Sequence, residues 1–208
     1  IVDNELHPPA QARKLPPWLE PGIVVAPALF EAKFSDHDPN AVAASLELPV
    51  NDTGGSRGGR IKVHGVIDRI DLLFKADTGC LTGLRVIDYK GISRGRITPG
   101  QLIAQIASNR DCQLPVYGLA ARQIFFPEQP AFDPSWLDAT HVQYYGYTSS
   151  LKTMGDCVRK NYVTLNAMVA QPEPAAPLRL LDAFCRGISE RVAHLRQGNF
   201  PVIPQTCD

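Results

Sequence analysis

Three charged residues, Asp68, Asp88 and Lys90, have the types and spacing that could support chemistry. Asp88 and Lys90 flank Tyr89 at the end of an apolar run, so in a strand their side chains leave one face and that of Tyr89 the other. Two neighbouring carboxylates repel each other, and a hard cation such as Mg²⁺ relieves that repulsion while binding phosphate oxygens. Such an ion lowers the pKa of a bound water. Lys90 could then orient that water and stabilise charge on a phosphate diester.

The position of Asp68 relative to this pair depends on the centre of the predicted hairpin. A hairpin centred on Gly79 places Asp68 opposite Lys90, and one centred on Thr78 places it opposite Asp88; opposed residues of an antiparallel pair share a face. Either register gathers two carboxylates and one ammonium. A salt-bridged surface hairpin fits this pattern as well as a metal site does, although the apolar residues before Asp88 make an unpaired carboxylate costly there.

Hydrophobic periodicity predicts the elements that must hold these residues. Apolar, β-rich runs predict strands at residues 23–25, 29–34, 61–74, 84–89 and 141–147. Steps of three and four predict one helix through Leu114, Tyr117, Ala121 and Ile124, and a second over about 177–197. The buried stripe of the second helix is predicted to be Leu181, Phe184, Ile188, Val192 and Leu195, with Gly198 as its stop. This order predicts an α/β fold around a mixed sheet.

Composition limits what the protein can be. The chain has 208 residues, 44% of them hydrophobic, and 21 basic residues balance 21 acidic ones, so it is no polycation. No apolar run approaches the roughly 20 residues of a membrane helix. Residues 1–22 carry five prolines and predict an extended lead-in, followed by one domain over residues 23–208. The chain starts at Ile1 rather than Met, so we expect a fragment of a longer protein or a processed product.

Three ordered motifs make the sequence familiar: GVIDRID at residues 65–71, VIDYK at 86–90 and QLPVY at 113–117. They resemble the nuclease domain of the PD-(D/E)XK superfamily, and within it the RecB/AddB-type nucleases of bacterial helicase–nuclease complexes. The resemblance implies a restriction-endonuclease-like core, a mixed central β-sheet flanked by helices. It also implies a deoxyribonuclease that uses Mg²⁺ or Mn²⁺, acts as an exonuclease in recombination and double-strand-break repair, and works with a helicase domain or subunit. The alternative is a non-catalytic DNA-binding or scaffolding module.

The resemblance also implies roles for individual residues. It makes Asp68 and Asp88 the metal-binding carboxylates, Lys90 the catalytic lysine, and the backbone carbonyl of Tyr89 a further metal contact. Glu31 resembles the acidic residue that precedes the core hairpin, and a solvent-facing strand glutamate is its alternative.

Two further sets of residues border this predicted centre. Gln113 and Tyr117 are one helical turn apart and share a face; the resemblance places both beside the DNA backbone, with Gln113 in the catalytic set, while Tyr117 could instead belong to the core. Asp71 is an odd number of positions from Asp68, so in a regular strand it points away from the metal. We expect it to form a structural ion pair with Arg69.

Basic residues lie around this region in spite of the neutral total. Arg94 and Arg96 flank Gly95 just beyond Lys90, and we expect them to contact phosphates. Others could equally be a solvated face: Arg57, Arg60, Lys62, Arg110 and Arg122.

The sequence departs from the family in two respects. No upstream histidine fits the additional metal ligand that many members carry. AddB-type relatives hold a [4Fe–4S] cluster, which is not expected here. The five cysteines lack ligand spacing and predict a reducing, cytoplasmic setting: Cys80, Cys112, Cys157, Cys185 and Cys207.

Overall fold

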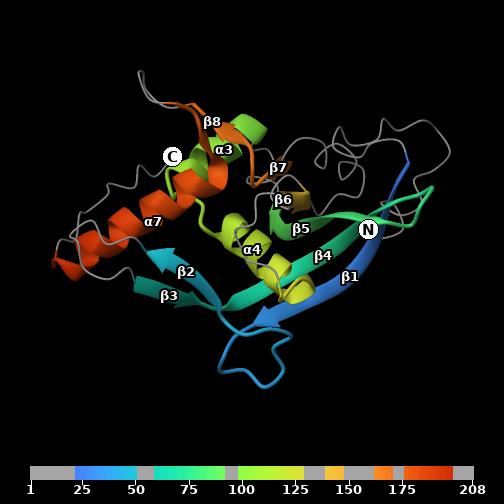
Figure 1. Cartoon of the computed structure of the whole chain (residues 1–208), viewed down its shortest axis with the longest axis horizontal. Helices are drawn as coiled ribbons and strands as arrows, with labels where there is room; N and C mark the ends of the chain where they lie inside the picture. Colours follow the sequence, from blue (N-terminus) through green and yellow to red (C-terminus); the bar gives the residue numbers. More distant parts are fainter. Residues whose placement is uncertain are drawn as a thin grey trace.

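The computed structural model describes residues 22–50, 59–91, 98–128, 139–147, 162–170 and 176–198. The main element is a five-stranded sheet of order β1-β4-β5-β6-β7, in which β5 and β6 are parallel and the other neighbours antiparallel (Figure 1). Its strands are β1 (Ile23–Phe34), β4 (Gly65–Lys75), β5 (Leu81–Gly91), β6 (Thr140–Tyr147) and β7 (Tyr162–Thr164). Two small sheets pair β2 (Leu46–Val50) with β3 (Gly59–Val63), and β8 (Met168–Val169) with β9 (Leu178–Arg179). The helices are α3 (Pro99–Ala107), α4 (Gln113–Phe125) and α7 (Leu180–Arg196).

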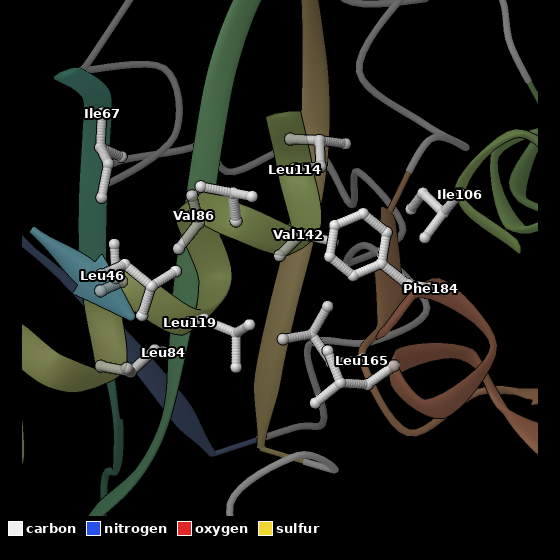
Figure 2. Close-up of a cluster of buried hydrophobic side chains, with 14 of the residues drawn as sticks. Leu46, Ile67, Leu84, Val86, Ile106, Leu114, Leu119, Val142, Leu165 and Phe184 are labelled. Carbon is white, nitrogen blue, oxygen red and sulfur yellow. The ribbon is translucent and has the colours of Figure 1, made fainter. Parts of the chain in front are cut away.

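The α/β fold with a mixed central sheet is confirmed. Helix α4 follows β5 and precedes β6, and this crossover allows the two strands to run parallel. It packs on β5 and β6, and leucines of α4 meet Val86 and Val142 of the sheet (Figure 2). Gly118 permits this close approach, because a Cβ there would lie 2.9 Å from Val142 Cγ1 and from Leu165 Cδ1.

The single long strand predicted over residues 61–74 is wrong, because the chain changes sheets at His64. The first part is β3, which pairs with β2, and the second is β4, which joins the central sheet. Gly65 begins β4 where space is short: a Cβ on it would lie 3.1 Å from Phe34 Cζ. By contrast, the two runs predicted at residues 23–34 form one strand, β1, whose register shifts between Pro27 and Leu29. Proline has no amide hydrogen, so Pro27 cannot donate a hydrogen bond to continue the pairing with β4.

Helices α3 and α7 pack against each other beyond the sheet. Helix α3 was not predicted, although Thr98 and Gln101 form a capping box at its start and Pro99 follows the cap. In α7 the predicted stripe is correct for Leu181 and Phe184, whereas Leu195 is 53% exposed. Gly198 has φ +73°, the left-handed conformation typical of a residue that ends a helix.

Some predictions fall on residues outside the described ranges. These are the proline-rich lead-in and the segment that contains Arg94 and Arg96. In the part of the chain that the structure describes, no helix is long and apolar enough to cross a membrane.

Candidate active site

The end of β5 carries the centre of the site. Asp88 and Lys90 lie on the same face, and Lys90 Nζ contacts Asp88 Oδ2 at 2.6 Å. The Asp88 side chain is 1% exposed, whereas that of Lys90 is 22% exposed. The ammonium therefore lies between a buried carboxylate and solvent, where a phosphate could reach it.

Asp68 reaches the same strand end from β4. The paired residues of β4 and β5 have the register centred on Thr78, and the pairing ends at Arg69 and Ile87. One step further, Asp68 comes opposite Asp88, and its Oδ2 accepts a hydrogen bond of 2.7 Å from the amide of Tyr89. Of the two registers that the sequence left open, the structure has the one that opposes the two carboxylates. The Tyr89 carbonyl stays a predicted metal contact.

Helix α4 brings Gln113 and Tyr117 to this centre. Gln113 Nε2 donates to Asp88 Oδ1 at 2.8 Å and to the Tyr117 hydroxyl at 2.9 Å, so both amide protons are used. Tyr117 also belongs to the core, because its ring meets that of Phe34 edge to face at 6.2 Å. Gln113 thus fixes the orientation of the Asp88 carboxylate from the helix side.

The surroundings of Asp88 shift its pKa in opposite directions. Burial raises the pKa of Asp88, contact with Lys90 lowers it in part, and the charges of Asp68 and Asp111 raise it further, so the net direction is upward. The ionised carboxylate is therefore less stable here than in water. A cation bound beside Asp88 would stabilise this ionised form.

Glu31 lies next to Asp68 along the sheet. Its neighbours Phe30 and Ala32 pair with Arg69 and Ile67. Glu31 is exposed and has φ +49°, a left-handed conformation that costs free energy in any residue but glycine. Among the described residues, no three histidine, cysteine or acidic side chains are grouped so that they could hold a metal ion. The structure therefore does not gather Glu31 with Asp68 and Asp88, and its metal role stays a prediction.

Asp71 forms the structural ion pair that the sequence predicts. Arg69 Nε contacts Asp71 Oδ1 at 2.6 Å, with both side chains fully buried, and Arg85 Nε donates to Asp71 Oδ2 at 2.7 Å. Arg69 also donates to the Tyr89 hydroxyl at 3.3 Å. The second aspartate of the GVIDRID motif is therefore tied to arginines rather than to Asp88.

The basic residues around the hairpin differ in what they can offer a polyanion. Arg60 pairs with Glu47 at 2.6 Å and Lys62 with Asp36 at 2.8 Å. Arg122 is 1% exposed, so it cannot form part of a solvated basic face. Arg57, Arg94 and Arg96 lie outside the described residues.

Sequence analysis missed two residues of this region, Asp111 and Tyr144. Asp111 Oδ1 accepts hydrogen bonds from the amides of Gln113 and Leu114 at the start of α4, and Tyr144 donates its hydroxyl proton to Asp111 Oδ2. An aspartate just before a helix is a known start signal and could have revealed Asp111. Alternation within β6 shows only that Tyr144 is buried, not what it contacts.

Comparison with known proteins decides the family. A family model described as the PD-(D/E)XK nuclease superfamily matches residues 8–208. The chain belongs to the PD-(D/E)XK nuclease superfamily. Neither the search of curated proteins nor the search of solved structures found a match. The five-stranded mixed sheet and its helices are consistent with the restriction-endonuclease-like fold.

Members of this superfamily are typically nucleases that use divalent metal ions such as Mg²⁺. The donor atoms on β4 and β5 fit such an ion. Mg²⁺ is usually bound through one or two carboxylates, with waters and substrate phosphates completing its coordination, and Asp68 and Asp88 supply two. Within the described residues the hydrogen bonding of Asp68 is confined to Oδ2, so Oδ1 would be the oxygen available to such an ion.

Proposed function

We propose that this protein is a divalent-metal-dependent DNA nuclease that hydrolyses phosphodiester bonds. The observation that carries the proposal is the arrangement around Asp88. Lys90 contacts one carboxylate oxygen at 2.6 Å and Gln113 the other at 2.8 Å, while Asp68 accepts the amide of Tyr89, the residue next to Asp88, at 2.7 Å. A surface salt bridge would need neither a buried carboxylate nor a partner on each of its oxygens.

Each residue has a role in this proposal. Asp68 and Asp88 hold the metal ion, with the Tyr89 carbonyl as a further ligand, and the ion supplies Lewis acidity and a water of lowered pKa. Gln113 keeps Asp88 in the orientation that ligation needs. The Lys90 ammonium lies at the boundary with solvent, where it can orient the attacking water and stabilise the negative charge that develops on the phosphate.

DNA as the substrate, exonucleolytic action and a role in recombination and double-strand-break repair are the finer parts of this proposal. They rest on the likeness of the GVIDRID, VIDYK and QLPVY motifs to RecB/AddB-type nucleases. The same likeness supports a helicase domain or subunit as partner. A labelled duplex with one blocked end would separate exonuclease from endonuclease action, because an exonuclease releases nucleotides from the free end only.

Cleavage of a labelled oligonucleotide tests the activity directly. We expect the wild type to cleave DNA with Mg²⁺ or Mn²⁺ and to stop when EDTA is added. Lys90→Ala should lose roughly 10²–10³ in rate, the usual effect of removing one preorganised electrostatic group. Lys75→Ala is the matched control, because Lys75 is exposed at the far end of β4. This variant should cleave like the wild type.

Calorimetry with Mn²⁺ tests the metal separately. Asp68→Asn should weaken Mn²⁺ binding, whereas Lys90→Ala should retain it because the lysine is not a ligand. A wild type that binds DNA and Mn²⁺ yet never cleaves would favour the non-catalytic DNA-binding module. Cleavage by Lys90→Ala within threefold of the wild type would contradict the role of the lysine.

A further inference from the structure

Asp111 and Tyr144 form a buried pair beside the candidate active site. Asp111 precedes α4 and is 7% exposed, and Tyr144 lies in β6 and is 4% exposed. The Tyr144 hydroxyl donates to Asp111 Oδ2, while Asp111 Oδ1 accepts the amides of Gln113 at 3.2 Å and of Leu114 at 3.5 Å. The pair therefore ties the middle of the sheet to the first turn of α4.

The ring of Tyr144 contacts the lysine of the site. In the parallel pairing of β5 and β6, Tyr144 is the partner of Asp88, and Lys90 Nζ lies 5.7 Å from the ring centroid. This is within the range of a cation–π contact. A lysine side chain loses conformational entropy when it is ordered. The ring and the Asp88 carboxylate together restrict where the Lys90 ammonium can be.

Both oxygens of Asp111 are engaged, one by the sheet and one by the helix. Oδ2 accepts from Tyr144 and Oδ1 from the helix amides. Asp111 accepts the backbone amide of Gln113, and the side-chain amide of Gln113 in turn donates to Asp88 Oδ1. A displacement of the α4 start would therefore move the donor that orients Asp88.

We infer that Asp111 and Tyr144 are positioning residues: the ring of Tyr144 holds Lys90, and the Asp111–Tyr144 hydrogen bond fixes the start of α4 so that Gln113 reaches Asp88. The inference rests on the proposed nuclease activity. It assigns neither residue a contact with DNA or with the metal. Their loss should consequently reduce turnover more than substrate or metal binding.

Kinetics of two variants separate the ring from the hydroxyl. Tyr144→Leu removes both, and we expect kcat to fall roughly 10–100-fold, the usual effect of a small misplacement of a catalytic group. KM and Mn²⁺ affinity should stay within threefold. Tyr144→Phe keeps the ring and should recover only part of the loss, because it still lacks the hydrogen bond to Asp111. Phe184→Leu controls for lost packing, because Phe184 is a fully buried aromatic residue of α7 outside the site.

An NMR measurement tests the contact without any cleavage. The protein is labelled with ¹³C-lysine, and Lys90→Arg assigns the Lys90 signal. The ring current of Tyr144 should shift the ε-methylene protons of Lys90 upfield. Tyr144→Leu should abolish this shift and Tyr144→Phe should keep it.

The outcomes separate the inference from the function on which it rests. A wild type without cleavage would overturn the proposed function, and the Lys90 shift would still decide whether Tyr144 holds the lysine. Absence of the shift in the wild type would overturn the inference. So would a Tyr144→Leu protein whose kcat falls no more than that of Phe184→Leu.

Discussion

The Lys90 ammonium lies 2.6 Å from Asp88 Oδ2, yet the pKa of Asp88 is raised, because burial outweighs the attraction of the lysine. The ionised carboxylate is thus held in a place that disfavours it. Energetically unfavourable charges of this kind cluster at functional sites. Under the proposed function, a metal ion bound beside Asp88 would compensate for this cost.

Asp88→Asn should therefore stabilise the metal-free protein at neutral pH. The folded-state pKa of Asp88 lies above its unfolded value, so the folded state binds the proton more tightly and stability falls as pH rises through the folded pKa. Asparagine never carries that charge. We expect a gain on the order of 1 kcal/mol at pH 7 in EDTA, measured by urea unfolding.

The gain should shrink as pH falls, since wild-type Asp88 then becomes neutral too. With saturating Mn²⁺ the order should reverse, because the wild type gains binding energy that the variant lacks. An Asp88→Asn protein less stable than the wild type in EDTA would mean that the Lys90 contact outweighs burial.

Much of this site could be predicted from the sequence, because it depends on strand parity. Asp88 and Lys90 had to share a face, and Asp68 could only oppose one of them. The register depends on the turn, where Gly79 adopts φ +65°, and on a shift between Leu73 and Phe74, beyond which the ladder is centred on Thr78. No sequence pattern distinguishes a turn centred on Thr78 from one centred on Gly79.

What the sequence could not predict depends on packing between distant segments. The break at His64 separates two β-rich runs that look continuous, because only the pairing of β3 with β2 sends them to different sheets. Tyr144 reaches Lys90 through a parallel pairing that needs α4 as a crossover. Such contacts follow from topology rather than from local periodicity.

Asp71 should be a stability residue rather than a metal ligand, although it belongs to the same motif as Asp68. It is fully buried between Arg69 and Arg85. Asp71→Asn leaves two buried guanidinium groups without their shared carboxylate, which should cost about 3–5 kcal/mol. Urea unfolding measures this loss, with Asp77→Asn in the exposed turn as control. A loss below 1 kcal/mol, or a large loss of Mn²⁺ affinity in folded protein, would contradict the assignment.

His141 should make the protein sensitive to acid. Burial, with a contribution from the charge of Arg85, lowers the pKa of His141 to about 4 from 6.5. The unfolded chain therefore binds the proton first, and stability should fall as pH drops from about 6.5 to 4, by about 3 kcal/mol from this group.

Replacing His141 by glutamine should flatten the stability profile in that range. Thermal unfolding between pH 7 and 4 gives the comparison, and His64→Gln, at an exposed histidine between β3 and β4, is the control. A variant whose stability declines with acid as steeply as the wild type would assign the sensitivity to other groups.

DNA should be held mainly by Arg94 and Arg96. A chain with no net charge cannot attract a polyanion as a whole, so local cations must do so. The charges of Arg60 and Lys62 are already paired with Glu47 and Asp36, and Arg122 is buried. Arg94 and Arg96 are the two basic residues that follow Lys90 most closely in the sequence.

The salt dependence of binding tests this path. The double variant Arg94→Ala/Arg96→Ala should lower the log–log slope of affinity against salt by roughly one unit per phosphate contact, and it should weaken binding equally across DNA sequences. Fluorescence anisotropy with a labelled oligonucleotide measures the slope. Arg60→Ala/Lys62→Ala removes the same number of charges and should change it little, because those charges are compensated by Glu47 and Asp36. If the control flattens the slope and the arginine variant does not, DNA crosses the β2–β3 sheet instead.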